Sequence, residues 1–403
     1  MQSLFRNRNF VFVWLASVFD NISLGIVLYT QNWYVVDALH MKSQLAWVTI
    51  ATTVPRLGLM LYGGVLADRL PKIGVMATTF IVRLAVMLIG ALLLWQGHMS
   101  IWALIAVAGA FGTLDAFFIP SRDALMPSIV ADRDELSRAN TMMQATNQIG
   151  MILGPQIGGI LLGILPSYFA NYCLTACLMA LCTLMISSVR ERAGAVRVHA
   201  LNQMAALQEG LRYVMASRVL RTQMSIYVIA NLLFTGAVSV GIPIIASEHL
   251  ANGARGLSYL MSAYGFGMVS GFAALMRFPP RKKRLALICI LIVIEGGLVA
   301  LQGISYSLPL SVALQWMLGV CVACNNVPML SVLQQYTDRD KLGRVMSVNS
   351  VTSMGLSPVS YAVVSVLLAS GASVGLIMPV FGLTMSIVIA FMALTSATVR
   401  EAD

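Results

Sequence analysis

Long apolar stretches, each near the length that crosses a lipid bilayer, follow one another along this sequence. A membrane-spanning helix needs about 20 mostly apolar residues, whereas a transmembrane β-strand alternates polar and apolar positions over about 10 residues. The stretches here are continuous, and only 10% of the 403 residues are charged, against about 25% in soluble domains. The sequence therefore predicts an all-α integral membrane protein with twelve transmembrane helices, near residues 10–36, 44–67, 73–96, 99–121, 140–165, 167–189, 222–247, 256–277, 285–304, 308–333, 344–369 and 373–397.

A weak internal repeat relates the two halves of the chain. Asp132 and Asp338 lie 206 positions apart, each in a charged segment between apolar stretches. Arg138 and Arg344 have the same offset. Pro120 is expected to end the helix before the first charged segment, which then forms a loop. A repeat of this size in an apolar protein indicates two homologous helical bundles.

The repeat predicts two pseudo-symmetric six-helix bundles, residues 1–189 and 222–403, joined by a cytoplasmic linker at 190–221. Within the linker a mostly apolar set recurs at helical spacing: Leu201, Met204, Gln208, Leu211 and Met215. This pattern predicts an amphipathic helix lying on the inner membrane surface. A solvated linker helix explains the pattern equally well.

The net charge of +10 follows from membrane topology and not from a nucleic-acid surface. Basic residues gather in the segments on one side of the predicted helices, whereas the other side holds only Lys42 and Arg255. Cytoplasmic segments of membrane proteins carry the excess of Lys and Arg. We therefore expect both termini in the cytoplasm, in a bacterial-type inner membrane, with the lipid bilayer as a partner and no nucleic acid.

Five charged residues lie inside predicted helices: Asp20, Arg56, Arg83, Asp115 and Glu295. A charge at bilayer depth is costly, so such residues usually pair, face a cavity or carry a function. An internal ion pair and a functional role are equally compatible with Arg83 and Asp115, and Asp115 falls near the cytoplasmic end of its predicted helix. For Asp20 we favour a functional role, because polar residues continue along its helix face.

Glu295 has no evident partner in the second half of the sequence. An unpaired carboxylate in an apolar medium favours its protonated form, which a proton carrier near neutral pH requires, although a neutral glutamic acid bonded between helices is equally possible. Other polar and aromatic residues could line a cavity, or could simply hold helices together. These cavity candidates are Asn21, Gln31, Trp33, Tyr227, Asn231, Phe234, Gln315 and Asn326.

Two short motifs suggest mechanical roles. Gly64–Arg69 precedes the turn after the second helix, where Asp68 and Arg69 could latch helix ends. In the fifth helix, Gly154, Pro155, Gly158 and Gly159 allow close packing and bending. Static close packing is the alternative interpretation of this second motif.

These motifs resemble those of the major facilitator superfamily over essentially the whole chain. Gly64–Arg69 is similar to the family's motif between helices 2 and 3, although Pro71 departs from its usual continuation. Gly154-Pro155 with Gly158-Gly159 is similar to the helix 5 motif of its antiporter branch. Pro55-Arg56 and the segment Glu209–Tyr213 resemble the subfamily of macrolide and enterobactin exporters.

The resemblance implies a secondary transporter that exports an amphipathic small molecule, a siderophore or a drug, by proton antiport with alternating access. Two cavity arginines would favour an anionic siderophore, but that preference is lost if both are consumed in ion pairs. A lysophospholipid transporter and a non-transporting membrane sensor or assembly protein are the alternatives. The sequence has no ATP-binding loop, no catalytic set and no metal-ligand pattern, so we expect no enzyme activity and no cofactor. We also expect a monomer.

Overall fold

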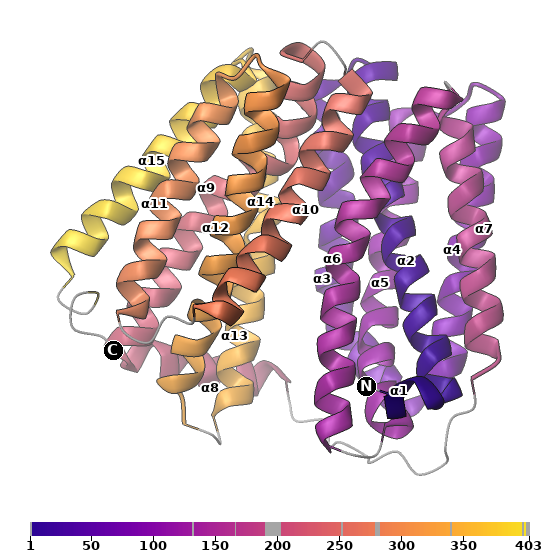
Figure 1. Ribbon diagram of the computed structural model, residues 1–403, viewed down its shortest axis with the longest axis horizontal. Helices are drawn as coiled ribbons and strands as arrows, with labels where there is room; N and C mark the ends of the chain where they lie inside the picture. Colours follow the sequence, from indigo (N-terminus) through magenta and orange to yellow (C-terminus); the bar gives the residue numbers. More distant parts are fainter. Residues whose placement is uncertain are drawn as a thin grey trace. The chain divides into compact units, whose positions relative to one another are not determined.

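The computed structural model describes residues 2–130, 133–165, 167–189, 203–250, 253–278, 283–338, 341–396 and 399, with some side chains in α3, α6, α8 and α13 outside that description. The secondary structure of these residues is helical, without β-strands. The chain forms two compact units, Met1–Ala200 and Leu201–Asp403. Each unit is a bundle of long helices (Figure 1).

In the first unit, α2 packs against α6 and α7, α3 against α5, and α4 against α5 and α7. Its helices are α1 (Gln2–Arg6), α2 (Arg8–Trp33, continued by the π-helix Tyr34–Ala38), the 3-10 helix Lys42–Gln44, α3 (Leu45–Arg69), α4 (Lys72–Trp95), α5 (Ile101–Ile129), α6 (Arg133–Ile164) and α7 (Tyr168–Ser187).

In the second unit, α10 packs against α12, α11 against α12 and α15, and α9 against α14 and α15. Its helices are α8 (Gln203–Ala216), α9 (Arg218–Glu248), α10 (Gly253–Arg277), α11 (Arg284–Gly303), α12 (Leu308–Gln335), α13 (Leu342–Gly355), α14 (Ser357–Ala369) and α15 (Val374–Thr395).

Several of these helices begin where the sequence supplies a capping side chain. Asn7 accepts a hydrogen bond from the Phe10 amide at the start of α2, and Ser217 accepts one from the Leu220 amide at the start of α9. Ser100 caps α5 in the same way. Such caps satisfy amide groups that the helix itself leaves unpaired.

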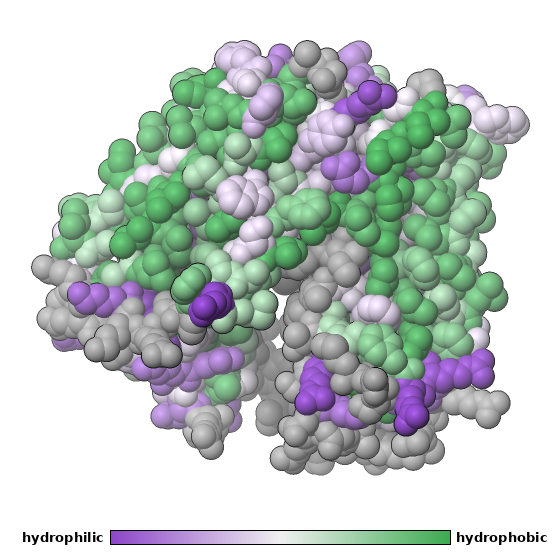
Figure 2. All heavy atoms as spheres, viewed as in Figure 1, coloured by the Kyte–Doolittle hydropathy of each residue, from purple (hydrophilic) through white to green (hydrophobic). Residues whose placement is uncertain are grey.

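The all-α membrane fold is confirmed. Ten helical runs among the described residues are long and apolar enough to cross a membrane, with α13 and α14 counted as one run. The two further predicted spans correspond to α3, which has 25 residues, and to α6, which contains the apolar segment Ile152–Ile164. In each unit, the face shown in Figure 2 is largely hydrophobic along the helices, and strongly hydrophilic side chains gather at one end.

The prediction that Pro120 ends a helix is wrong. Helix α5 continues through Pro120 and Pro127 to Ile129. Proline is tolerated within membrane-spanning helices, and the hydroxyl of Ser121 donates to the Phe117 carbonyl of the same helix at 2.8 Å. The charged segment that was expected to be a loop is also helical from Arg133 onward, because α6 begins there.

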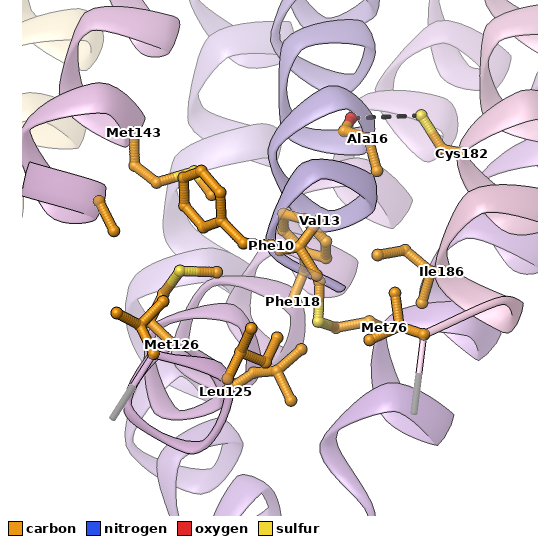
Figure 3. Close-up of a cluster of buried hydrophobic side chains, with 14 of the residues drawn as sticks. Phe10, Val13, Ala16, Met76, Phe118, Leu125, Met126, Met143, Cys182 and Ile186 are labelled. Carbon is orange, nitrogen blue, oxygen red and sulfur yellow. Dashed lines mark hydrogen bonds between the residues drawn. The ribbon is translucent and has the colours of Figure 1, made fainter. Parts of the chain in front are cut away.

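A hydrophobic cluster fills one half of the first unit. It is built from α2, α4, α5, α6 and α7, and Figure 3 shows Phe10, Val13, Phe118 and Ile186 converging within it. Most of these side chains are fully buried. The cluster fixes the rotation of these helices, and therefore sets which residues on the next turns face inward.

Long helices approach one another closely in both units. Between α2 and α6, a Cβ on Gly154 would lie 2.5 Å from Gly25 Cα, so the backbones touch. In the second unit, the Ser360 hydroxyl of α14 accepts from the Gly236 amide at 2.7 Å and donates to the Leu232 carbonyl at 2.6 Å. That hydroxyl therefore stands inside the hydrogen-bond ladder of α9, an arrangement associated with helix bending.

Candidate functional site

The charged residues of the first unit lie at the centres of four neighbouring helices. Asp20 is midway along α2, Arg56 along α3, Arg83 along α4 and Asp115 along α5. The expectation that Asp115 lies near a helix end is corrected, because α5 extends eight residues beyond the predicted end at 121. The sequence therefore brings two acidic and two basic groups together at the depth where charge is most costly.

Arg83 holds this group together. Its Nη1 donates to Asp20 Oδ1 at 2.7 Å, and its Nη2 donates to Asp115 Oδ1. All three residues are buried, Arg83 almost completely at 1% exposure. One guanidinium thus bridges carboxylates from α2 and α5 through charge-assisted hydrogen bonds, which are stronger than neutral ones.

Three phenyl rings surround the Arg83 guanidinium. Its Cζ lies 5.9 Å from the ring centre of Phe80, 5.5 Å from Phe111 and 5.1 Å from Phe118. The ring faces attract the cation electrostatically. Phe80 and Phe118 also belong to the hydrophobic cluster in Figure 3, so the ion network rests directly on the apolar packing of the unit.

Arg56 is the fourth charged residue of the network, and it lies farther from its carboxylate partner than Arg83 does. Its Nη1 lies 4.0 Å from Asp115 Oδ2, and its side chain is 30% exposed. Its Nε makes no hydrogen bond. With all four groups ionised, two positive and two negative charges balance, and Arg56 retains donors that a further acceptor could use.

The buried carboxyl of the second unit has a different environment. Glu295 lies near the middle of α11, 4% exposed, and accepts a hydrogen bond of 3.5 Å from Asn325 Nδ2 of α12. Among the residues that the structure describes, it forms no ion pair. Asn325 was not recognised from the sequence, where its neighbour Asn326 was chosen. Asn326 is exposed, because a shift of one residue turns a side chain by about 100° around a helix.

The remaining candidates in the first unit lie on α2. Asn21 donates to the Ser17 carbonyl of its own helix at 2.7 Å and packs against Gly150 of α6. Gln31 is 2% exposed, and its Nε2 has no hydrogen-bond partner. Trp33 is buried at the end of the helix. The structure does not bring these residues into contact with the Arg83 network.

In the second unit, three of the predicted cavity residues lie on α9. Tyr227 and Phe234 pack against a hydrophobic cluster, and Asn231 donates to the Tyr227 carbonyl at 3.0 Å. Gln315 of α12 is 2% exposed, with its Nε2 unpartnered. Their role as a substrate wall stays a prediction.

The predicted gating residues fall into two groups. In α6, Gly154 and Gly158 approach Gly25 and Tyr29 of α2, Gly159 is buried, and Pro155 lies within the helix. The side chains of Asp68 and Arg69, with Gly64, lie outside the described part of α3, so the latch stays a prediction.

The linker contains the predicted helix from Gln203 onward, as α8, while residues 190–202 lie outside the described ranges. Glu209 accepts from Lys341 and Arg344, each at 2.5 Å. The hydrogen bond from Lys341, with the two positive charges, lowers the pKa of Glu209 below its ordinary value. These contacts dock α8 against the start of α13, while Leu211 and Met215 remain exposed.

The Major Facilitator Superfamily model matches residues 13–360. The chain belongs to this superfamily. It is therefore a multi-pass membrane transporter and not an enzyme. No cluster of three or more metal-ligating side chains occurs among the described residues.

Known relatives of this superfamily member include drug exporters. It is 27% identical over 270 residues, 64% of this chain and 65% of the relative, to the multidrug efflux pump Tap of Mycolicibacterium fortuitum. Tap of Mycobacterium tuberculosis H37Rv is 26% identical over 64% of this chain and 63% of its own length. The alignments thus span slightly less than two thirds of these relatives. An uncharacterized MFS-type transporter of Bacillus subtilis, YkuC, is 20% identical over 90% of this chain and 86% of its own.

Solved transporters share the fold. The nucleoside transporter NupG superposes with a TM-score of 0.76 at 14% identity, covering 95% of this chain and 99% of its own. A POT-family transporter in complex with 5-aminolevulinic acid gives 0.75 at 12% identity, covering 98% and 97%. At this identity the likeness concerns architecture alone.

Proposed function

We propose that this transporter exports an amphipathic, drug-like molecule across a bacterial inner membrane in exchange for protons. Three things support the proposal: membership of the superfamily, relatives named multidrug efflux pumps, and carboxyls at the centres of membrane-spanning helices. The chemistry required is reversible protonation of a buried group, coupled to alternating exposure of a substrate site.

Glu295 is the observation that carries proton coupling. Among the described residues, Glu295 bonds an amide and no cation, so it can exist in both protonation states without leaving an unpaired cation beside it. Asp20 would serve as a second and weaker carrier, because protonation of its carboxylate would compete with the hydrogen bond from Arg83. We assign Glu295 the larger part in coupling, with Asp115, Arg83 and Arg56 setting the charge balance around Asp20.

The arginines favour a drug over an anionic siderophore. Arg83 already binds two carboxylates and is 1% exposed, so it has little capacity for a substrate anion. The Nε atoms of both arginines are unpartnered, but only Arg56, with a side chain 30% exposed against 2% for Arg83, presents an accessible surface. Siderophore export would therefore depend on Arg56, whereas a neutral or weakly basic drug needs neither arginine.

The test begins with a thermal-shift screen of purified protein against macrolides, cationic dyes, siderophores and lysophospholipids. A ligand at about 100 times its Kd adds about 2.7 kcal/mol when it binds only the folded state. We expect shifts with drugs. A shift confined to siderophores and lost in Arg56→Gln would replace the drug assignment, and one confined to lysophospholipids would favour lipid transport.

The identified ligand then drives transport in proteoliposomes, with internal pH recorded. Glu295→Gln should abolish substrate-driven proton flux while leaving ligand binding and thermal stability nearly unchanged. Asp20→Asn should reduce the flux. Asp123→Asn is the matched control, because this carboxylate is 62% exposed and pairs with the adjacent Arg122. Undiminished flux in Glu295→Gln would remove Glu295 from the mechanism, and wild-type transport without proton movement would exclude antiport.

A further inference from the structure

A line of buried polar groups leads from Glu295 to one end of the second unit. Glu295 and Gln302 are seven residues apart on α11, which places them on one face of the helix, about 10 Å apart along its axis. Asn325, bonded to Glu295, and Gln315 lie on α12. None of these four residues is more than 6% exposed.

Several atoms in this line have no hydrogen-bond partner among the residues that the structure describes. They are both side-chain atoms of Gln302, Nε2 of Gln315 and Oδ1 of Asn325. A buried polar atom without a partner pays its full desolvation cost. Buried water commonly satisfies such groups, typically with about three hydrogen bonds per molecule. The unpartnered donors and acceptors therefore favour water between α11 and α12.

The line continues to the surface at the α11–α12 turn. The Ser311 hydroxyl, one helical turn beyond Gln315, donates to the Ser305 hydroxyl at 2.9 Å. His249 Nδ1 lies 3.3 Å from the Ser305 carbonyl oxygen, and the His249 ring stacks on Tyr306, which is 71% exposed. The polar line thus begins at a buried carboxyl and ends at solvent-accessible side chains.

The neighbouring face of α11 is apolar and tightly packed. Gly296 and Gly303 lie directly against α15, where added Cβ atoms would meet Gly382 and Pro379. Ala300, 7% exposed, lies between them in the same contact. This face has no room for water, so hydration would follow only the face that bears Glu295 and Gln302.

We propose that α11 and α12 enclose a narrow water-filled path from the α11–α12 turn to Glu295, with Gln302 and Gln315 as its amide lining. Both walls of the path belong to α11 and α12, and its hydration does not depend on the function proposed above. That it delivers protons to the Glu295 carboxyl rests on the function proposed above. In the predicted topology this end of the unit faces the cell exterior, so the path would load the carrier from outside.

Cysteine accessibility tests the path without requiring transport. The six native cysteines are replaced by alanine, and single cysteines are placed at Ser311, Gln315 and Gln302, with Ala300→Cys as the equally buried control. Iodoacetamide reacts with hydrated, ionised thiols, and intact-protein mass spectrometry gives the rates. We expect the rate to fall in the order 311, 315, 302, with each at least about tenfold faster than at 300, because thiol reactivity follows access.

Rates at 302 and 315 that are no faster than at 300 would overturn the path. Variants are compared only when size-exclusion chromatography shows a monodisperse protein, and the three positions provide independent readings. A second measurement addresses the protons: Gln302→Leu should slow substrate-driven proton flux several-fold while ligand binding stays unchanged. Fast labelling together with unchanged flux in Gln302→Leu would leave a hydrated path and overturn proton delivery through it.

Discussion

The two units repeat one helical plan but treat a buried carboxyl in opposite ways. In the first unit, Asp20 and Asp115 share Arg83, which three phenyl rings enclose. In the second, Glu295 accepts a hydrogen bond from the amide of Asn325 and pairs with no cation in the described part of the chain. A neutralised network gives position and rigidity, whereas a carboxyl without a cation can change its protonation state at little structural cost. We therefore propose that the first unit serves mainly as a charged scaffold and that the second unit carries the main titrating group.

Removing Arg83 should have the largest effect. Arg83→Met leaves two buried carboxylates without their shared cation, and breaking a buried pair in this way costs about 3–5 kcal/mol. We expect a large fall in the unfolding temperature in detergent. The triple variant Arg83→Met, Asp20→Asn, Asp115→Asn should recover much of it. An Arg83→Met protein as stable as the wild type would contradict the scaffold role of the network.

The next prediction concerns the close backbone contact between α2 and α6. Gly154→Ala places a Cβ against the backbone of Gly25, and overpacking of this kind costs about 1–3 kcal/mol. Gly297→Ala in α11 is the control, since nothing lies within 4 Å of its added Cβ, and it should be neutral or stabilising. Thermal unfolding of both proteins measures the difference. Equal effects would mean that the contact between α2 and α6 is not a tight one.

Ser360 provides a smaller test in the second unit. Ser360→Ala removes the hydroxyl that stands between Leu232 and Gly236, and a lost hydrogen bond costs about 1 kcal/mol. The freed Gly236 amide should then close its own helical bond, so hydrogen exchange around it should slow. Ser370→Ala is the control, because that hydroxyl bonds only the Leu367 carbonyl of its own turn. Faster exchange at Gly236 would show that the hydroxyl stabilises the local backbone instead of loosening it.

The smallest expected effect concerns pH and the docking of α8. The pKa of Glu209 is lowered by the hydrogen bond from Lys341 and by the charges of Arg344 and Lys341. Its stabilising contribution is therefore complete above its ordinary pKa of 4.5 and is lost as the pH falls through the lower folded-state value. Thermal unfolding compared between wild type and Glu209→Gln should differ at neutral pH and converge in acid. A difference that persists unchanged in acid would contradict the ion contacts.

The sequence predicted the fold and the charged residues but not their partners. Apolar length identified the helices, and the cost of buried charge singled out Asp20, Arg56, Arg83, Asp115 and Glu295, all of which lie near helix centres. Pairing depends on helix rotation and neighbour order, which one sequence does not contain.

Asn325 shows the limit most clearly. It and Asn326 are adjacent in the sequence, and only the packing of α12 decides which one reaches Glu295. The extent of α5 is not predicted either, because a proline indicates a helix end, whereas α5 continues through Pro120 and Pro127. The role of Ser360 depends on a contact between α9 and α14, and no local sequence pattern predicts that contact.

The Arg83 network also bears on how the chain enters a membrane during synthesis. An arginine at the centre of a spanning helix costs about 2.5–3.5 kcal/mol on insertion scales, and α4 has Arg83 at its centre. Asp20 is made 63 residues earlier, so α2 is available as a partner when α4 is inserted. Asp115 follows 32 residues later. The order of the helices along the chain therefore lets Arg83 meet an opposite charge already in the bilayer, and Asp115 in turn meets Arg83.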